Sequence, residues 1–204
     1  MPILTRGRVI ALTVFSGALL APAYLWPYSL SGTSDAPTLL LGDVALVDRA
    51  AYWVNLPYSQ VKLVHISRPK RGDMVLVLRP DRPVLIFKRV IGLPGETIEM
   101  RDNRVLIDGQ AIPLKILPRA DFSWVPESHG MGSSVYDEGG HWAAFTPGFG
   151  KYKDVPAVHL AGDEYFLLGD NRDVSLDCRV WGPLKENAIF GKVVLTLPRG
   201  PRRK

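Results

Sequence analysis

The sequence predicts a mostly β domain, built as a curled sheet or barrel with an irregular inserted cap, behind one N-terminal transmembrane helix. Three observations support this prediction. Residues 9–26 carry no charge, short apolar runs of period two recur between turn residues after residue 40, and residues 111–162 show neither pattern. The 204 residues, 47% of them hydrophobic, suffice for one packed domain and an appendage.

The apolar run at residues 9–26 is close to the shortest length that spans a bilayer. Two arginines precede it and three aromatic residues lie at its far end: Arg6, Arg8, Tyr24, Trp26 and Tyr28. Arginine favours the cytoplasmic side, so everything after residue 30 is expected on the outer face of the cytoplasmic membrane, behind a single span. The predicted parts are a cytoplasmic segment at 1–8, an anchor at 9–28, an extracytoplasmic domain at 29–198 and a basic tail at 199–204.

A cleaved signal peptide is the alternative interpretation of the N-terminus. The segment Ala21-Pro22-Ala23 resembles a small-residue cleavage site, and the apolar run is short enough for one. Because Pro22 disfavours cleavage just after it, we expect a retained anchor.

Charge and cysteine content narrow the class of protein further. The formal net charge is +5, and much of it lies at the two ends of the chain, which indicates membrane flanks and a lipid partner rather than nucleic acid. Cys178 is the only cysteine, so no intrachain disulfide can form. Stability outside the cytoplasm must then come from the core.

Alternating apolar runs predict at least eight strands in the main domain. They are expected at 44–47, 61–66, 73–78, 84–91, 97–100, 105–107, 165–168 and 190–197. Asp102-Asn103-Arg104 and Asp108-Gly109 have the turn chemistry of hairpins, because Asn and Gly tolerate positive φ. The intervening stretch at 111–162 is predicted to be an irregular but folded cap, since it is rich in aromatic residues as well as in proline.

A serine nucleophile is expected in the segment Ser31–Leu39, directly after the apolar run. The hydroxyl of Ser34 would need a base within hydrogen-bond reach. The four histidines are dispersed, and none has the context of a catalytic triad or the spacing of a zinc site: His65, His129, His141 and His159. We therefore expect neither a metal nor another cofactor.

Lys88 is the better candidate for the base. It lies in the run Leu85–Ile91, which is otherwise strongly apolar except for Arg89. Burial favours the neutral form of an amine, and a neutral amine can take a proton from a hydroxyl near neutral pH. The alternative is a lysine at a strand edge whose amine reaches water.

A third segment, Leu168–Gly182, is denser in polar groups than a plain turn requires. Asp170 and Asn171 could cap or brace a turn, Asp177 could pair with Arg179, and Ser175 could orient the lysine amine. A hydrogen-bonded hairpin loop without a catalytic role is the structural alternative.

These segments, taken in order, resemble the motifs of type I signal peptidases. They are Ser34 with Pro37-Thr38-Leu39 and Gly42-Asp43, Arg71-Gly72-Asp73, Lys88-Arg89-Val90-Ile91-Gly92-Leu93-Pro94-Gly95, and Gly169-Asp170-Asn171-Arg172 through Trp181-Gly182. The resemblance covers the anchor and nearly all of the chain after it. It implies a signal-peptidase-like β domain that uses a serine and a lysine without histidine.

The resemblance also implies a role for each matching residue. Ser34 corresponds to the nucleophile, Lys88 to its general base and Ser175 to the serine that orients the lysine. Asp177 and Arg179 correspond to a supporting ion pair. The backbone N–H of Ser34 would be one oxyanion donor.

Three positions depart from the family pattern. Asp35 stands where members usually have Met, and we expect its carboxylate to face solvent or a partner, since a negative charge beside the nucleophile could slow attack. Gly32 cannot supply the serine hydroxyl that completes the oxyanion hole in some members, so Thr33 or a second backbone N–H would substitute. Cys178 replaces a serine and is expected to be structural.

The expected function is a membrane-anchored serine endopeptidase that cleaves signal peptides from exported precursor proteins after small residues. Three alternatives remain. One is a specialised peptidase that matures a pilin or conjugation-type substrate. Another is a catalytically impaired relative that acts as a binding module. The third is a self-cleaving repressor, which the apolar N-terminus and the lack of a DNA-binding helix pair disfavour.

Overall fold

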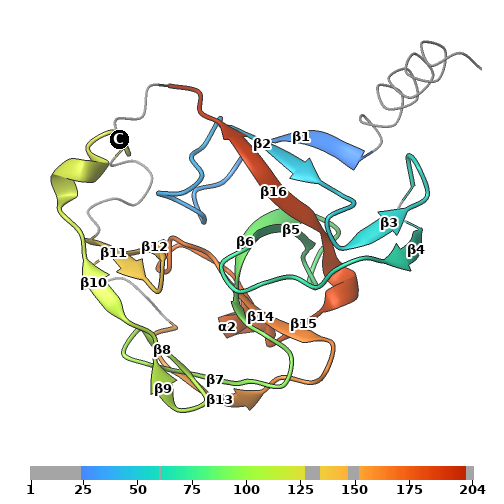
Figure 1. The fold of residues 1–204 in the computed structure, drawn as a ribbon. Coiled ribbons are helices and arrows are strands. Elements are labelled where there is room, and N and C mark those ends of the chain that lie inside the picture. The colour runs from blue at the N-terminus through green and yellow to red at the C-terminus, as the bar shows by residue number, and fades with distance from the viewer. Residues whose placement is uncertain (1–23, 60, 127–133, 147–151, 201–204) are drawn as a thin grey trace, which may run out of the picture.

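The computed structural model describes residues 24–59, 61–126, 134–146 and 152–200, and almost all of its regular structure is β (Figure 1). The main sheet has seven strands in the order β1-β2-β16-β5-β6-β14-β15. Their bounds are β1 Leu25–Ser29, β2 Val44–Asp48, β5 Met74–Leu78, β6 Leu85–Gly92, β14 Glu164–Leu168, β15 Leu184–Lys185 and β16 Ile189–Leu197. Each neighbouring pair runs antiparallel. The predicted mostly β class is confirmed.

Smaller sheets adjoin the main one, and the eight expected strands are all present. The bounds of their strands are β3 Trp53–Asn55, β4 Lys62–His65, β7 Thr97–Arg101, β8 Arg104–Ile107, β9 Gln110–Ala111, β10 Leu114–Ile116, β11 Ser134–Glu138, β12 His141–Phe145 and β13 Val155–His159. The short helical elements are η1 Arg119–Phe122, α2 Cys178–Trp181 and η3 Glu186–Ala188. The hairpin turns have the expected positive φ, at Asp102 and Asn103 and again at Asp108 and Gly109.

The predicted anchor at 9–28 is wrong at its C-terminal end. Residues 25–29 form β1, an edge strand that pairs with β2 from Leu25↔Asp48 to Ser29↔Val44. Pro27 is tolerated there because an edge strand can spare one N–H. In the part of the chain that the structure describes, no helix is long and apolar enough to cross a membrane. Residues 1–23, and with them the rest of the predicted anchor and the Ala21-Pro22-Ala23 segment, lie outside that part.

The described residues of the stretch at 111–162 are folded, as expected, but they are more regular than predicted. Strands β10, β11 and β12 form a three-stranded sheet, and β13 pairs with β7. Phe122, Val125, Val135 and Ala144 make a small core under this sheet. Three-residue and five-residue strands that alternate only partly are hard to recognise from periodicity, which explains the wrong prediction of irregular structure.

Apolar side chains cover both faces of the central strands. In β5, Val75 and Val77 belong to one buried cluster, whereas Met74 and Leu76 belong to another. The neighbouring strand β6 is buried at every residue from Phe87 to Gly92. A strand covered on both faces gives any polar residue within it almost no contact with water.

Candidate active site

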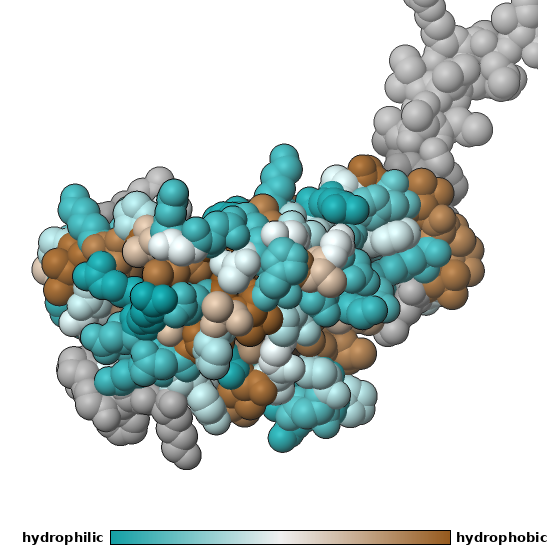
Figure 2. Space-filling model, turned by 90° about the horizontal axis from the view of Figure 1, so that it is seen from below, coloured by the Kyte–Doolittle hydropathy of each residue, from teal (hydrophilic) through white to brown (hydrophobic). Residues whose placement is uncertain are grey.

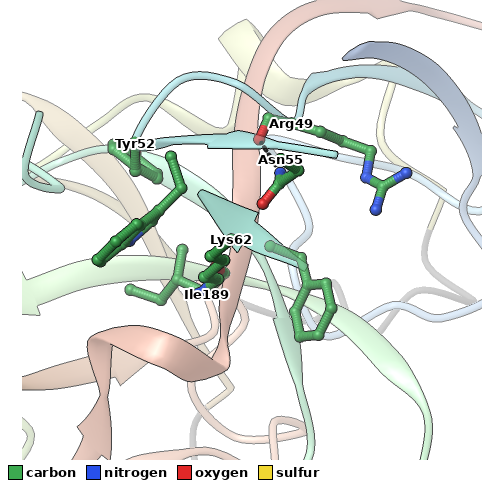
Figure 3. Close-up of a pocket in the computed structure, with 7 residues that line it drawn as sticks. Arg49, Tyr52, Asn55, Lys62 and Ile189 are labelled. Atoms are coloured by element: carbon green, nitrogen blue, oxygen red, sulfur yellow. Dashed lines mark hydrogen bonds between the residues drawn. The ribbon is translucent and has the colours of Figure 1, made fainter. Parts of the chain in front are cut away.

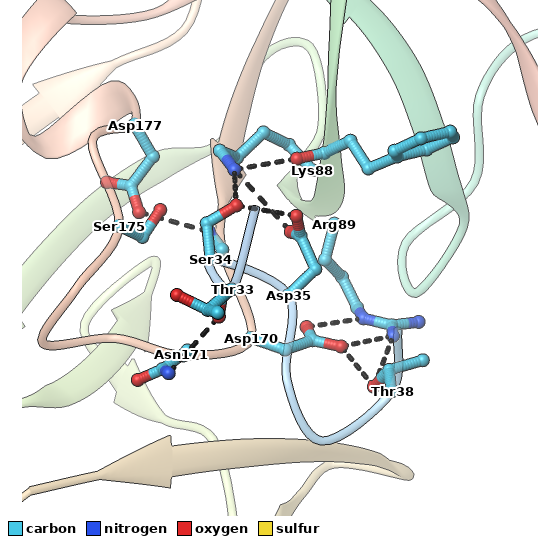
Figure 4. Close-up of polar contacts among 12 residues, drawn as sticks. Thr33, Ser34, Asp35, Thr38, Lys88, Arg89, Asp170, Asn171, Ser175 and Asp177 are labelled. Atoms are coloured by element: carbon cyan, nitrogen blue, oxygen red, sulfur yellow. Dashed lines mark hydrogen bonds and ion pairs between the residues drawn. The ribbon is translucent and has the colours of Figure 1, made fainter. Parts of the chain in front are cut away.

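The predicted nucleophile lies in a turn between β1 and β2, held by the loop that follows β14 (Figure 4). The Asn171 backbone N–H donates to the carbonyl of Ser34 at 2.9 Å, and its side-chain amide donates to the carbonyl of Thr33 at 3.2 Å. Within the described residues, the N–H of Ser34 donates to no backbone carbonyl. The loop thus holds the backbone carbonyls of Thr33 and Ser34, and the N–H of Ser34 stays available.

The structure brings Lys88 to Ser34 across 54 positions of sequence. Lys88 projects from the buried strand β6 and is 1% exposed. Its Nζ lies 2.9 Å from Ser34 Oγ and also donates to the Phe87 carbonyl at 2.6 Å. The amine is buried, whereas the hydroxyl is partly buried. Because the two groups are in direct contact, a proton can pass between them.

Asp35 does not face solvent, and that expectation is wrong. Its side chain points into the site and is buried, with Oδ2 accepting from Ser34 Oγ at 2.6 Å and Oδ1 lying 3.5 Å from Lys88 Nζ (Figure 4). Burial raises the pKa of Asp35, and the nearby Lys88 opposes that rise. The physical reason for this placement is that a buried lysine needs a counter-charge, which no strand pattern reveals.

The loop after β14 is stiffened by a second acidic residue. Asp177 accepts from Arg179 Nε at 2.8 Å and Nη2 at 2.9 Å, and from the N–H of Gly169 at 3.0 Å. Burial alone would raise the pKa of Asp177, but Arg179 outweighs it and the pKa is lowered. Asp177 also caps the N-terminus of α2.

Ser175 lies beside the segment that carries Ser34, and within the described residues its hydroxyl makes no hydrogen bond to Lys88. A Cβ placed on Gly169 would come within 2.2 Å of Ser175 Oγ and 2.5 Å of the Ser34 carbonyl, so glycine is required where these segments meet. The Ser175 hydroxyl is buried beside Asp177, and it makes no well-formed hydrogen bond within the described residues. An orienting role toward Lys88 stays a prediction.

A pocket of about 130 Å³ opens beside Ser34 and Asp35. Its apolar residues come from the turn and from the three strands β1, β5 and β6: Tyr28, Leu30, Leu76, Leu85, Ile86 and Phe87. A second, much smaller pocket lies between Arg49, Trp53, Asn55 and Lys62, and its space of about 10 Å³ is that of one water (Figure 3). Only the first of these two pockets could take a side chain of a bound peptide. In the described residues, no three His, Cys, Asp or Glu side chains converge as metal ligands would.

The family model described as signal peptidase, peptidase S26, matches residues 3–197. The chain belongs to the S26 signal peptidase family. It is 32% identical over 162 residues to signal peptidase I of Pseudomonas fluorescens, covering 76% of this chain and 55% of that protein. It is 34% identical over 167 residues to signal peptidase I V of Bacillus subtilis strain 168, covering 81% and 82%. The resemblance inferred from the motifs is confirmed.

Two further comparisons define the extent of the likeness. The chain spans 55% and 56% of the lengths of the two signal peptidases I from Pseudomonas fluorescens and Pseudomonas aeruginosa. A crystal structure of a signal peptidase I from Enterococcus faecalis V583 is 28% identical and covers 63% of this chain and 99% of its own, with a TM-score of 0.39.

The sequence motifs of this S26 protein did not reveal the part that Arg89 and Thr38 play in the site. Arg89 donates to Asp170 through Nε at 2.8 Å and Nη2 at 2.5 Å, and to the Gly72 carbonyl at 2.7 Å. The Thr38 hydroxyl also donates to Asp170. The signal was a second cation beside Lys88 in an apolar strand, which must also be buried and paired. Asp170 therefore ties β6 to the turn that carries Ser34.

Cys178 of this S26 chain has the properties of a structural residue. It is 2% exposed, its burial raises the pKa of the thiol, and the N–H of Leu167 donates to its sulfur at 3.2 Å. A thiol held in its protonated form is a poor nucleophile.

Proposed function

We propose that this chain is a serine endopeptidase that cleaves signal peptides from exported precursor proteins, with Ser34 as the nucleophile and Lys88 in the general base. The observation that carries the proposal is the 2.9 Å contact between the buried amine of Lys88 and the hydroxyl of Ser34, which lines the pocket. Membership of the S26 family supports the same reaction class.

The reaction starts when Ser34 Oγ attacks the carbonyl carbon of the scissile peptide bond and its proton passes to the base. The electron pair of the carbonyl moves onto oxygen, where the N–H of Ser34 can stabilise it, with Thr33 close by. Collapse of this intermediate breaks the C–N bond, the leaving amine receives a proton, and an acyl-enzyme remains. Water then attacks the ester by the same sequence of steps.

The pocket beside Ser34 supports a preference for small side chains before the cut. It has room for a small apolar group, and Ser31 and Gly32 line it together with apolar side chains of β1, β5 and β6. A larger side chain would have to displace packed side chains of β5 and β6, which costs free energy.

A location at the outer face of the cytoplasmic membrane is part of the proposal. The uncharged run at 9–26 would be its single anchor, with the N-terminus inside. Figure 2 shows hydrophobic residues gathered at the end of the molecule where β3 and β4 lie. Five exposed apolar residues of this hairpin could contact lipid: Leu56, Tyr58, Val61, Leu63 and Val64.

Precursor cleavage by the detergent-solubilised full chain tests the proposal. Ser34→Ala and Lys88→Met should each abolish cleavage while circular dichroism shows that both variants are folded. The melting temperature of Ser34→Ala should stay close to that of the wild type, and that of Lys88→Met should be lower because Asp35 loses its counter-charge. Processing that survives in Ser34→Ala would exclude Ser34 as the nucleophile.

A catalytically impaired binding module is the second candidate, because Asp35 contacts both Ser34 and Lys88. An acylating inhibitor that labels Ser34 in the wild type would exclude it. A dedicated maturation peptidase would be labelled as well but would not process a generic exported precursor.

A further inference from the structure

The Ser34 hydroxyl has two polar neighbours where a serine and lysine pair requires one. Asp35 Oδ2 lies 2.6 Å from Oγ, and Lys88 Nζ lies 2.9 Å away on another side. A hydroxyl has one proton to donate but can accept from a second group. In this geometry Ser34 donates to the carboxylate and accepts from the amine.

The surroundings of Lys88 fit an ammonium group. Three acceptors surround Nζ, namely Ser34 Oγ at 2.9 Å, the Phe87 carbonyl at 2.6 Å and Asp35 Oδ1 at 3.5 Å. An ammonium has three N–H donors and no lone pair, so each donor has an acceptor. Lys88 and Asp35 are 1% and 5% exposed, so loss of one charge would leave the other buried and uncompensated.

We infer that Asp35 is a further catalytic residue, which accepts the Ser34 proton while Lys88 remains the cation of a buried ion pair. The inference rests on the proposed function, since it concerns the same serine. Under this inference Asp35 and Lys88 act together as the general base. Before the hydroxyl attacks, the two side chains share one titratable proton, which resides on Lys88.

The protons balance over one cycle. The O–H bond of Ser34 breaks as its proton moves to Asp35 Oδ2 and Oγ bonds to the substrate carbon. When the C–N bond breaks, Lys88 gives a proton to the leaving amine and regains one from Asp35 across their contact. The pair returns to its starting charge, and in deacylation the attacking water supplies the proton that Ser34 finally recovers.

The pH dependence of cleavage distinguishes a shared base from a lone lysine. A lone lysine must lose its proton before it can act, whereas the pair needs only an ionised Asp35. Burial raises the pKa of that carboxyl, and Asp170 adds to the rise, whereas Lys88 and the Ser34 hydrogen bond oppose it. The net increase brings the basicity of the carboxylate closer to the working pH. The wild type should therefore stay active at pH values where a lone lysine would be protonated.

The experiment measures kcat/KM for a precursor-derived peptide between about pH 5 and about pH 10, with the full chain in detergent. Asp35→Asn keeps the shape of the side chain and removes its charge and basicity. Asp35→Met introduces the residue that family members usually have at this position. Asp163→Asn, at an exposed carboxylate outside the site, is the matched control, and Ser34→Ala gives the background rate.

In Asp35→Asn the acidic limb of the profile should move to higher pH by about one unit or more, and alkaline pH should restore much of the lost rate. Asp35→Met should behave in the same way, and Asp163→Asn should match the wild type. An unshifted limb, or a higher rate at neutral pH in both Asp35 variants, overturns the inference.

The wild-type profile decides the question if neither Asp35 variant folds. An acidic limb of the kcat/KM profile with its midpoint in the pKa range of a carboxylic acid supports the inference. An acidic limb with its midpoint above about pH 8 overturns it. Cleavage that survives in Ser34→Ala refutes the proposed function instead, so the two failures are distinguishable.

Discussion

Lys88 and Arg89 follow each other in β6, and each reaches a different buried carboxylate, Asp35 for the lysine and Asp170 for the arginine. Side chains of successive strand residues leave the backbone in opposite directions, so one dipeptide can serve two sites. The first ion pair contacts the Ser34 hydroxyl. The second connects β6 to the loop after β14 and, through Thr38, to the turn that carries Ser34.

Arg89→Lys should lower both stability and activity. The two parallel hydrogen bonds to Asp170 need a guanidinium, and a lysine can make only one of them from a different position. We expect a loss of about 2–3 kcal/mol in the free energy of unfolding, measured by urea denaturation. Arg104→Lys, at an exposed arginine, is the control, and equal losses in the two variants would contradict a structural role for this pair.

Gly169→Ala should reduce kcat strongly. A methyl group there would meet Ser175 Oγ at 2.2 Å and the Ser34 carbonyl at 2.5 Å, so the turn that carries Ser34, the proposed nucleophile, must move. A displacement of about 1 Å at a reacting group can cost about 10²-fold in rate. Gly162→Ala has open space for its methyl group and should keep normal kinetics.

Ser175→Ala should stabilise the protein while reducing cleavage. The buried hydroxyl makes no well-formed hydrogen bond within the described residues, and relief of such a group is worth about 1 kcal/mol. Activity should fall if the hydroxyl orients Lys88 once a peptide is bound. Thermal unfolding and kcat/KM measure the two effects separately, and unchanged kinetics would remove Ser175 from the catalytic group.

Glu138 should make folding sensitive to acid. Burial alone would raise its pKa, but Arg172 and His141 outweigh that effect and lower the pKa to about 2. Because the folded pKa lies below the ordinary value, the stabilisation is full above about pH 4.5 and is lost as the pH falls toward 2.

Glu138→Gln tests this prediction by urea denaturation at several pH values. The variant leaves Arg172 buried without its carboxylate, so it should lose about 3–5 kcal/mol at pH 7. Its deficit relative to the wild type should shrink between about pH 4.5 and pH 2. Glu99→Gln, at a carboxylate paired with Arg101 on the surface, should show no such change.

The sequence predicted the features that depend on composition and local pattern. The eight expected strands are short apolar runs between turn residues, and the apolar run around Lys88 favoured a buried amine, so β6 and Lys88 could be recognised without a structure. The family motifs then selected Ser34 as the partner of Lys88.

What the sequence could not predict depends on how distant segments pack. The direction of the Asp35 side chain is set by Lys88, which lies 53 positions away. The residues of β1 are apolar enough to continue a membrane span, and only their pairing with β2 distinguishes them as a strand. The strands of the 111–162 stretch are short, and their stability comes from the sheet they form together.

The position of β1 limits how far Ser34 can travel from the start of the ordered sheet. The turn that carries the serine begins just after Ser29, five residues before Ser34 (34 − 29). Such a length of chain reaches at most about 17 Å even when fully extended. Ser34 therefore stays close to the start of the ordered sheet. If a surface holds the chain ahead of Leu25, it also sets the distance from that surface at which a peptide bond must lie in order to be cut.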